Sequence, residues 1–145
     1  MKKIFFIVLL FCYTFSNSQN WQNFTDSIAT LSSPRSCDLN GDGILDIVIG
    51  GGTDSLFSPN GIMAYNGADG SLIWKSSSRD EIFGSAIFMD INSDSINDVI
   101  IAGRSAQLLA INGIDGTLIW EYFPYNVNPV DSGLLNFYNP QFVND

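Results

Sequence analysis

The chain has 145 residues, of which 15 are acidic, 6 are basic and none is histidine, so its formal net charge at pH 7 is −9. The absence of histidine excludes a Ser-His-Asp relay and a zinc site with histidine ligands. The acidic charge argues against nucleic acid or an anionic membrane surface as a binding partner.

The N-terminus is typical of a secretory signal peptide. Two lysines are followed by the apolar run 4–15 and then by small or polar residues. The run is too short for a comfortable bilayer span. We therefore expect residues 1–18 to be removed, leaving a protein that does not span the membrane and is secreted or held at the cell surface. A lipid anchor on Cys12 is disfavoured, because the bulky Phe11 precedes it.

Residues 19–30 are expected to form a lead-in to the folded part. Without the signal peptide, four basic and fifteen acidic residues remain, which gives a formal charge of −11. Six of these acids lie in two short loops, so the acidity is local and favours the binding of a cation. Cys37 is then the only cysteine, so it forms no intramolecular disulfide and is expected to be a small buried apolar residue.

The first acidic loop opens the stretch DLNGDGILDIVIGGG, residues 38–52. Oxygen-bearing side chains recur at every second position, and Ca²⁺ prefers a shell of carboxylate, amide and carbonyl oxygens. The ligands expected in the loop 38–46 are the side chains of Asp38, Asn40, Asp42 and Asp46 and the backbone carbonyl of Ile44. Gly43 supplies the permissive turn between them.

The second acidic loop has the same layout in DINSDSINDVIIAGR, residues 90–104. The ligands expected in the loop 90–98 are the side chains of Asp90, Asn92, Asp94 and Asp98 and the backbone carbonyl of Ile96. Ser95 takes the place of Gly43, and a serine with positive φ costs about 1 kcal/mol. We therefore expect the second loop to bind calcium more weakly than the first.

The acidic loops have three competing interpretations. An EF-hand needs a glutamate at position 12, which is Ile49 in one loop and Ile101 in the other, and it needs flanking helices. Mg²⁺ fits less well, because it demands octahedral geometry and usually keeps several waters. Solvated turns rich in Asp and Asn that bind nothing remain the alternative. The recurrence of one nine-residue spacing favours calcium.

The two loops belong to a longer repeat. They lie 52 residues apart, whereas AYNGADGSLIW (64–74) and AINGIDGTLIW (110–120) lie 46 apart. A unit of about 50 residues therefore occurs twice, with six extra residues in the first copy. The segment 52–61, rich in Gly, Ser, Pro and Asn, is the expected position of this insertion and should be a surface loop.

Each unit carries four short strand signals separated by turns. In the second unit the expected strands span 84–89, 98–103, 107–112 and 117–122; in the first, three of them span 47–50, 62–66 and 71–76. Four strands in about 50 residues is the pattern of a β-propeller blade. We therefore predict an all-β fold of four-stranded antiparallel blades, about two and a half blades of a larger propeller. Blade 1 is expected at 31–78, blade 2 at 79–122, and a linker with the start of a third blade at 123–145.

The stretch DLNGDGILDIVIGG resembles the FG-GAP (VCBS-type) repeat of integrin alpha-subunit propellers and of many secreted bacterial proteins. The resemblance covers nearly all of residues 31–122. It implies a calcium-stabilised propeller, often found in adhesion or glycan-associated surface proteins. The chain departs from the family pattern at Ser95 and lacks a clear Phe-Gly…Gly-Ala-Pro pair, for which FGSAI (83–87) is a partial echo.

AINGIDGTLIW also resembles the strand motif of pyrroloquinoline-quinone propellers. That resemblance implies that Trp74 and Trp120 pack one blade against the next and bind no cofactor.

The sequence therefore predicts a non-enzymatic, secreted, calcium-binding module for adhesion or for binding a protein or glycan ligand, and it predicts neighbouring blades as partners. The alternative is the N-terminal propeller of a secreted enzyme, either a polysaccharide lyase or a quinoprotein-like dehydrogenase, with catalytic residues elsewhere. The adjacent Asp80 and Glu81 are expected to flank a strand rather than to form an acid–base pair.

Overall fold

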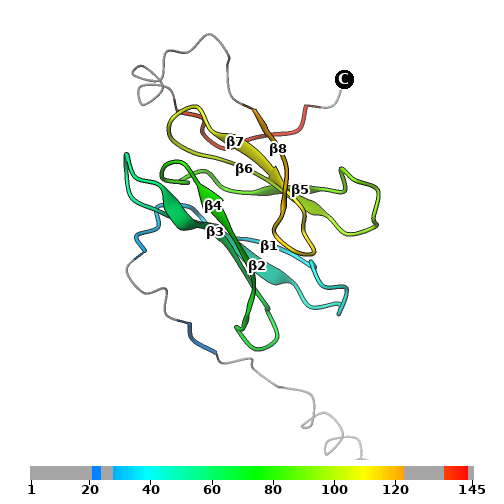
Figure 1. Cartoon of the computed structure of the whole chain (residues 1–145). Coiled ribbons are helices and arrows are strands. Elements are labelled where there is room, and N and C mark those ends of the chain that lie inside the picture. The colour runs from blue at the N-terminus through cyan, green and yellow to red at the C-terminus, as the bar shows by residue number, and fades with distance from the viewer. Residues whose placement is uncertain (1–20, 24–27, 123–135, 144–145) are drawn as a thin grey trace, which may run out of the picture.

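A computed structural model describes residues 21–23, 28–122 and 136–143 of the chain. The predicted signal peptide lies outside these residues, as do residues 123–135 and 144–145 of the predicted linker and third blade. The described residues form eight strands and no helix, which confirms the all-β prediction. The strands make two separate four-stranded antiparallel sheets, each with its strands in sequence order (Figure 1).

The strands of the first sheet are β1 (Arg35–Cys37), β2 (Asp46–Gly50), β3 (Ser58–Tyr65) and β4 (Leu72–Ser78). Those of the second sheet are β5 (Ile87–Met89), β6 (Asp98–Ala102), β7 (Leu108–Ile111) and β8 (Leu118–Tyr122). Each strand expected from the sequence is present, although β5 begins later than predicted. The four-strand composition of both repeats is thereby confirmed.

The two sheets also share their strand register. Cys37 pairs with Asp46 where β1 meets β2, and Met89 pairs with Asp98 where β5 meets β6. The final hairpin of each sheet has a register shift at the same place, directly after Ala64 and directly after Ala110. The sequence repeat is therefore a repeat of backbone structure at the level of single residue pairs.

The insertion in the first repeat differs from its prediction. Only the first part of 52–61 is a loop, because β3 already begins at Ser58, which pairs with Ser78 of β4. The register between Ser58 and Ile62 is irregular, which accommodates Pro59, since proline cannot donate to a strand ladder. The extra residues therefore lengthen β3 beyond its counterpart β7 and interrupt its regular pairing with β4.

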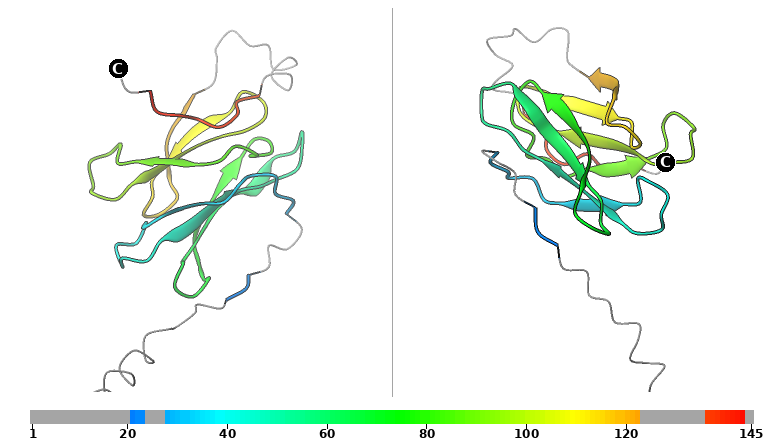
Figure 2. Two further views of the ribbon diagram at one scale, coloured as in Figure 1. Left: turned by 180° about the vertical axis from the view of Figure 1, so that it is seen from behind. Right: turned by 60° about the horizontal axis from the view of Figure 1, so that its bottom comes forward.

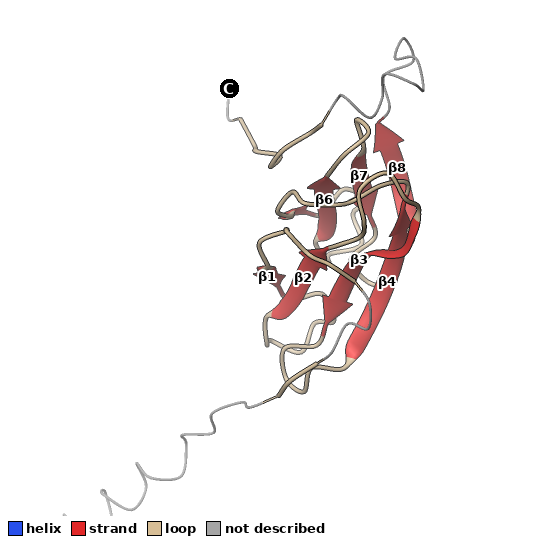
Figure 3. Ribbon diagram, turned by 90° about the vertical axis from the view of Figure 1, so that its left-hand side faces the viewer, coloured by secondary structure: helices blue, strands red, loops and turns tan. Residues whose placement is uncertain are grey.

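One hydrophobic core joins the two sheets, which lie against each other in Figures 1 and 2. Its buried members are Leu39, Val48, Ile62, Ala64, Trp74, Ile82, Ala86, Val99, Ile101, Leu109 and Ile111. All five residues of β6 are buried, as expected of a strand with partners on both faces. The last strands, β4 and β8, lie on the same side of the molecule (Figure 3).

The same backbone hydrogen bond forms where the chain leaves each of the two repeats. The N–H of Ile82 donates to the carbonyl of Gly51 at 3.0 Å, just before the second sheet begins. The N–H of Phe137 donates to the carbonyl of Gly103, also at 3.0 Å. Gly51 and Gly103 occupy matching positions at the ends of β2 and β6. Phe137 is therefore hydrogen-bonded to the end of β6 in the same way as Ile82 is hydrogen-bonded to the end of β2.

Candidate metal centres

The two acidic loops connect the first two strands of each sheet and project from the same side of the molecule (Figure 2). The loop 38–46 joins β1 to β2, and the loop 90–98 joins β5 to β6. Antiparallel pairing brings both ends of each loop together, which the pairs Cys37–Asp46 and Met89–Asp98 make explicit. Each set of predicted ligands is thus held on one tight connection.

Asp46, the last predicted ligand of the first loop, is completely buried. Its Oδ2 accepts the N–H of Leu39 at 2.8 Å, and its Oδ1 accepts the N–H of Gly67 at 3.0 Å. Burial of a carboxylate is tolerated only when its oxygens have such partners. A carboxylate offers about four lone-pair positions, so each oxygen retains one for a cation. Asp46 also ties the loop to the turn between β3 and β4.

Asp38 lies at the start of the same loop and accepts hydrogen bonds from within it. The N–H of Gly41 donates to Oδ1 at 2.7 Å, and the N–H of Gly43 donates to Oδ2 at 2.9 Å. Burial acts to raise the pKa of Asp38, but the N–H groups of Gly43, Gly41, Asn40 and Asp42 outweigh it and leave the pKa below its ordinary value. The carboxylate form, which a metal ion requires, is therefore favoured by the loop itself.

Asn40 and Asp42 each form a small turn by accepting the N–H group two residues further on. Asn40 Oδ1 accepts from Asp42 at 2.9 Å, and Asp42 Oδ1 accepts from Ile44 at 2.7 Å. Both residues are exposed. They are the side chains of the loop most open to an ion from solvent.

The second loop repeats all six of these hydrogen bonds at the matching positions. Asp90 accepts from Ser93 and Ser95 at 2.7 and 3.0 Å, Asn92 from Asp94 at 2.9 Å, Asp94 from Ile96 at 2.9 Å, and Asp98 from Ile91 and Gly113 at 2.8 and 3.0 Å. Asp98 is fully buried, like Asp46. Three further bonds join predicted ligands of this loop to one another. Asn92 Nδ2 donates to Asp94 Oδ2 at 2.8 Å, and the N–H groups of Asn92 and Asp94 donate to Asp98 Oδ2 and Asp90 Oδ1 at 3.3 and 3.2 Å.

Positions 4 and 6 of both loops adopt positive φ. The values are 75° and 81° at Gly41 and Gly43, and 65° and 75° at Ser93 and Ser95. The predicted strain at Ser95 is confirmed, and Ser93 adds a second strained residue that the prediction missed. Its signal was available in the sequence, since Gly41 stands at the matching place in the first loop.

The chemistry of the donors fits calcium, because every predicted ligand is an oxygen atom. In the described part of the chain, no three Asp, Glu, His or Cys side chains lie together closely enough to hold a metal ion. The three aspartates of a loop would therefore have to move closer together on binding. Such rearrangement lowers the net affinity, so the donor set fits a weak calcium site better than a tight one.

The two loops also touch each other. The side-chain amide of Asn97 lies 3.4 Å from the sulfur of Cys37, and Gly41 faces the side chain of Ile96. Cys37 is half-buried rather than fully buried, and Met89 at the matching position is exposed. The acidic charge of both loops is thus concentrated in one region of the surface.

Trp74 packs between the sheets as the strand motif implied. Its Nε1 donates to the carbonyl of Gly113 at 2.7 Å, and its ring lies against Gly116. Trp21 makes the matching contacts with the turn between β3 and β4. Its Nε1 donates to the carbonyl of Gly67 at 2.9 Å, and its ring lies against Gly70. One indole-to-turn contact therefore recurs in the described part of the chain.

Asp80 and Glu81 follow β4, but they are buried, which the sequence did not reveal. Asp80 Oδ1 accepts the N–H of Ser55 at 2.7 Å, and its Oδ2 accepts the hydroxyl of Ser105 at 2.6 Å. Glu81 Oε2 pairs with Arg104 Nε at 2.8 Å. The two carboxylates thus hold the β2–β3 and β6–β7 connections together.

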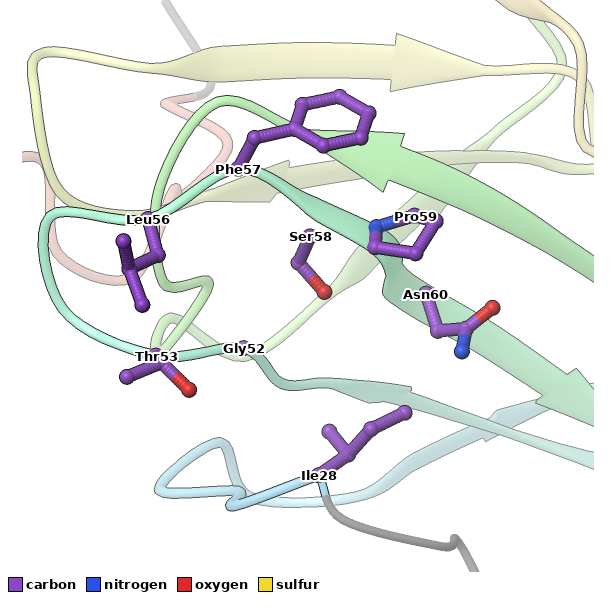
Figure 4. Close-up of a pocket in the computed structure, with 8 residues that line it drawn as sticks. All are labelled: Ile28, Gly52, Thr53, Leu56, Phe57, Ser58, Pro59 and Asn60. Atoms are coloured by element: carbon purple, nitrogen blue, oxygen red, sulfur yellow. The ribbon is translucent and has the colours of Figure 1, made fainter.

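A cavity of about 270 Å³ lies beside the insertion of the first repeat. It is lined by Ile28, Gly52, Thr53, Leu56, Phe57, Ser58, Pro59 and Asn60 (Figure 4). The Oδ1 atom of Asn60 is buried without a hydrogen-bond partner among the described residues. A buried acceptor without a protein partner is ordinarily satisfied by water. The neutral lining gives no chemical reason to assign an organic ligand.

Comparison with known proteins finds no matching family model, no matching curated protein and no matching solved structure. In the described ranges there is no helix with the length and apolar character needed to cross a bilayer.

Proposed function

We propose that this chain is a segment of a calcium-binding β-propeller of the FG-GAP (VCBS) type, and that each acidic loop binds one Ca²⁺. The observation that carries the proposal is the agreement of the two loops in all six hydrogen bonds between side chains and backbone. Turn preference alone favours isolated bonds of this kind, but it gives no reason for the same set to occur twice.

The side chains proposed to hold calcium are Asp38, Asn40, Asp42 and Asp46 in the first loop, and Asp90, Asn92, Asp94 and Asp98 in the second. The carbonyls of Ile44 and Ile96 complete the two sets. When bound, calcium would supply the positive charge that offsets the repulsion among three carboxylates. The chain's contribution is to hold those carboxylates on one tight connection and, at Asp38, to favour the ionised form. The proposed role is structural, because the loops connect paired strands.

Two observations support the propeller. The passage from sheet to sheet uses one recurring bond, Ile82 to Gly51 and Phe137 to Gly103. The contact of Trp74 with the next turn recurs for Trp21. Contacts that recur from unit to unit are expected when similar sheets are arranged around an axis. We propose blades at 31–78 and 79–122, with a third blade beginning after 123.

We further propose export of the mature protein and a role in adhesion or in binding a protein or glycan ligand. The support is the predicted signal peptide at 1–18 and the resemblance to FG-GAP repeats; fold alone does not fix function. Protein recovered from its natural host should lack about the first 18 residues by intact mass. Retention of Met1 in an intracellular product would overturn the export proposal.

Thermal unfolding with and without calcium tests the metal proposal. We expect weak sites with Kd of about 10⁻⁴ to 10⁻³ M, and free calcium at tenfold the Kd should add about 1.4 kcal/mol of stability for each site. The matched control is Asp69→Ala, which removes an exposed acid outside both loops and should leave the calcium effect intact. An unfolding temperature that does not respond to calcium would contradict the proposal.

A further inference from the structure

Leu39 belongs to the first acidic loop, yet its side chain is 1% exposed. It lies between the predicted ligands Asp38 and Asn40, and it belongs to the core shared by the two sheets. Its backbone N–H donates to Oδ2 of Asp46 at 2.8 Å. One residue therefore binds a predicted ligand through its backbone and enters the core through its side chain.

The side chain of Leu39 ends at a glycine that holds the other loop. A Cβ atom placed on Gly113 would lie 3.3 Å from Cδ2 of Leu39. The N–H of Gly113 donates to Oδ1 of Asp98 at 3.0 Å. Asp46 and Asp98, the last predicted ligand of each loop, thus accept hydrogen bonds from two residues, Leu39 and Gly113, that lie close together.

A second contact joins the loops beside this one. The Asn97 amide, next to Asp98 in the chain, donates to the sulfur of Cys37, which is next to Asp38. At the position that matches Leu39, Ile91 makes the same backbone bond to Asp98 at 2.8 Å, but its side chain is partly exposed. The side-chain link between the loops is therefore made by Leu39 of the first loop and not by Ile91 of the second.

We propose that Leu39 is a positioning residue that couples the two loops, so that calcium binding at either loop raises the affinity of the other. This inference rests on the proposed calcium sites. A restrained Asp46 restrains the backbone of Leu39, and a fixed Leu39 side chain limits the movement of Gly113, whose N–H holds Asp98. Coupling of this kind is reciprocal, so each site must affect the other by the same factor.

The first experiment titrates the full chain with calcium while NMR follows the amide signals of Gly43 in one loop and Ser95 in the other. Asp42→Ala should remove binding at the first loop and weaken binding at the second by about fivefold, the lower end for coupled sites. With Leu39→Ala in the background, Asp42→Ala should change the second site less than twofold. Leu39→Met keeps an apolar side chain of similar reach and should retain the coupling.

The second experiment needs no metal. In chelator-treated protein, Leu39→Ala should speed amide exchange at Gly113 about tenfold or more, whereas Ile91→Ala should leave Gly67 unchanged. If Leu39→Ala prevents folding, Leu39→Val shortens the same side chain more gently and Asn97→Ala removes the neighbouring contact with Cys37. Each should give a smaller change in the same direction.

The outcomes separate the two proposals. If neither loop binds calcium in the wild type, the proposed function fails, and the inference that rests on it fails with it. Amide exchange at Gly113 in the Leu39 variants then still decides whether Leu39 restrains Gly113. If both loops bind and Asp42→Ala leaves the affinity of the second loop unchanged, the coupling is wrong while the calcium sites stand. Unchanged exchange at Gly113 in folded Leu39 variants would also overturn the coupling.

Discussion

The two repeats build the same acidic loop from different residues at its most strained positions. The first has Gly41 and Gly43 there, and the second has Ser93 and Ser95, all with positive φ. Glycine accepts this conformation freely, whereas serine does so at a cost. The backbone path of the loop is therefore not a consequence of glycine. The hydrogen bonds to the aspartates and the asparagine are sufficient to impose it on serine.

A second difference lies in what covers each sheet. Trp74 on β4 is 5% exposed, because the second sheet packs on it, whereas Trp120 at the matching position on β8 is 38% exposed. Tyr122, also on β8, is exposed as well. The same residue is therefore expected to contribute more to the free energy of unfolding where another sheet covers it.

The largest expected effect is at the tryptophans. Trp74→Ala removes a buried ring and its hydrogen bond to Gly113, so we expect a loss of about 3–5 kcal/mol in the free energy of unfolding. Trp120→Ala should cost less than half as much, because its ring is already partly hydrated. Urea denaturation of both variants measures the difference. Equal losses would show that the two sheets are covered alike in solution.

The buried aspartates come next. Asp46→Ala leaves the N–H groups of Leu39 and Gly67 without their acceptor, and each buried donor left unpaired costs about 1–3 kcal/mol. Asp98→Ala should cost a similar amount through Ile91 and Gly113. These losses should appear even in chelator, when no metal contributes.

The control for the buried aspartates is Asp42→Ala at an exposed position of the same loop. It should change stability in chelator by less than about 0.5 kcal/mol. Denaturation in chelator and in calcium separates the two roles. If Asp42→Ala were as destabilising in chelator as Asp46→Ala, the hydrogen bonds of Asp46 to Leu39 and Gly67 would not have the structural role assigned to them.

The strained positions should give a smaller effect of opposite sign in the two loops. Ser95→Gly should stabilise the protein by about 0.5 kcal/mol, since relief of about 1 kcal/mol of strain is partly offset by the greater freedom of glycine in the unfolded chain. Gly43→Ser should destabilise it by a similar amount. Paired thermal denaturation measures both changes, and two changes of the same sign would refute the account of the strain.

The smallest effect is expected in the turns after β3 and β7. The hydroxyl and then the N–H of Ser71 lower the pKa of Asp69 below its ordinary value of 3.8, and Thr117 does the same for Asp115. A carboxyl with a lowered pKa adds stability above its unfolded pKa and loses it as the pH falls through the folded value. The contribution should therefore be complete above about pH 4 and decline below it. Carboxyl NMR titration should show both pKa values rising toward 3.8 in Ser71→Ala and Thr117→Ala.

Much of the fold could be predicted because the repeat of about 50 residues occurs twice in the sequence. The strands containing Val48 and Ile101, the turns and the loop spacing were predictable from recurring motifs, since one copy checks the other. The burial of Asp80 and Glu81 was not, because it depends on Ser105 and Arg104, which are distant in sequence and have no counterpart in the first repeat. The early start of β3 at Ser58 was missed for a related reason: an insertion has no second copy to compare.

The candidate ligands were also readable from spacing, but two of their properties were not. The burial of Asp46 and Asp98 arises from the turns at Gly67 and Gly113, far along the chain, and the contact of Leu39 with Gly113 requires both sheets. Spacing identifies which oxygen atoms lie on one loop, whereas packing decides which of them are buried and hydrogen-bonded to distant turns.

Calorimetric titration of chelator-treated protein with calcium tests the central claim most directly. The account predicts two equivalents of Ca²⁺ for the wild type, and one for Asp42→Ala and for Asp94→Ala, with the loop that contains Gly43 binding more tightly than the loop that contains Ser95. Asp69→Ala should keep both equivalents. Absence of binding in the wild type, or a stoichiometry that neither loop variant changes, would contradict the account and leave these loops as solvated turns.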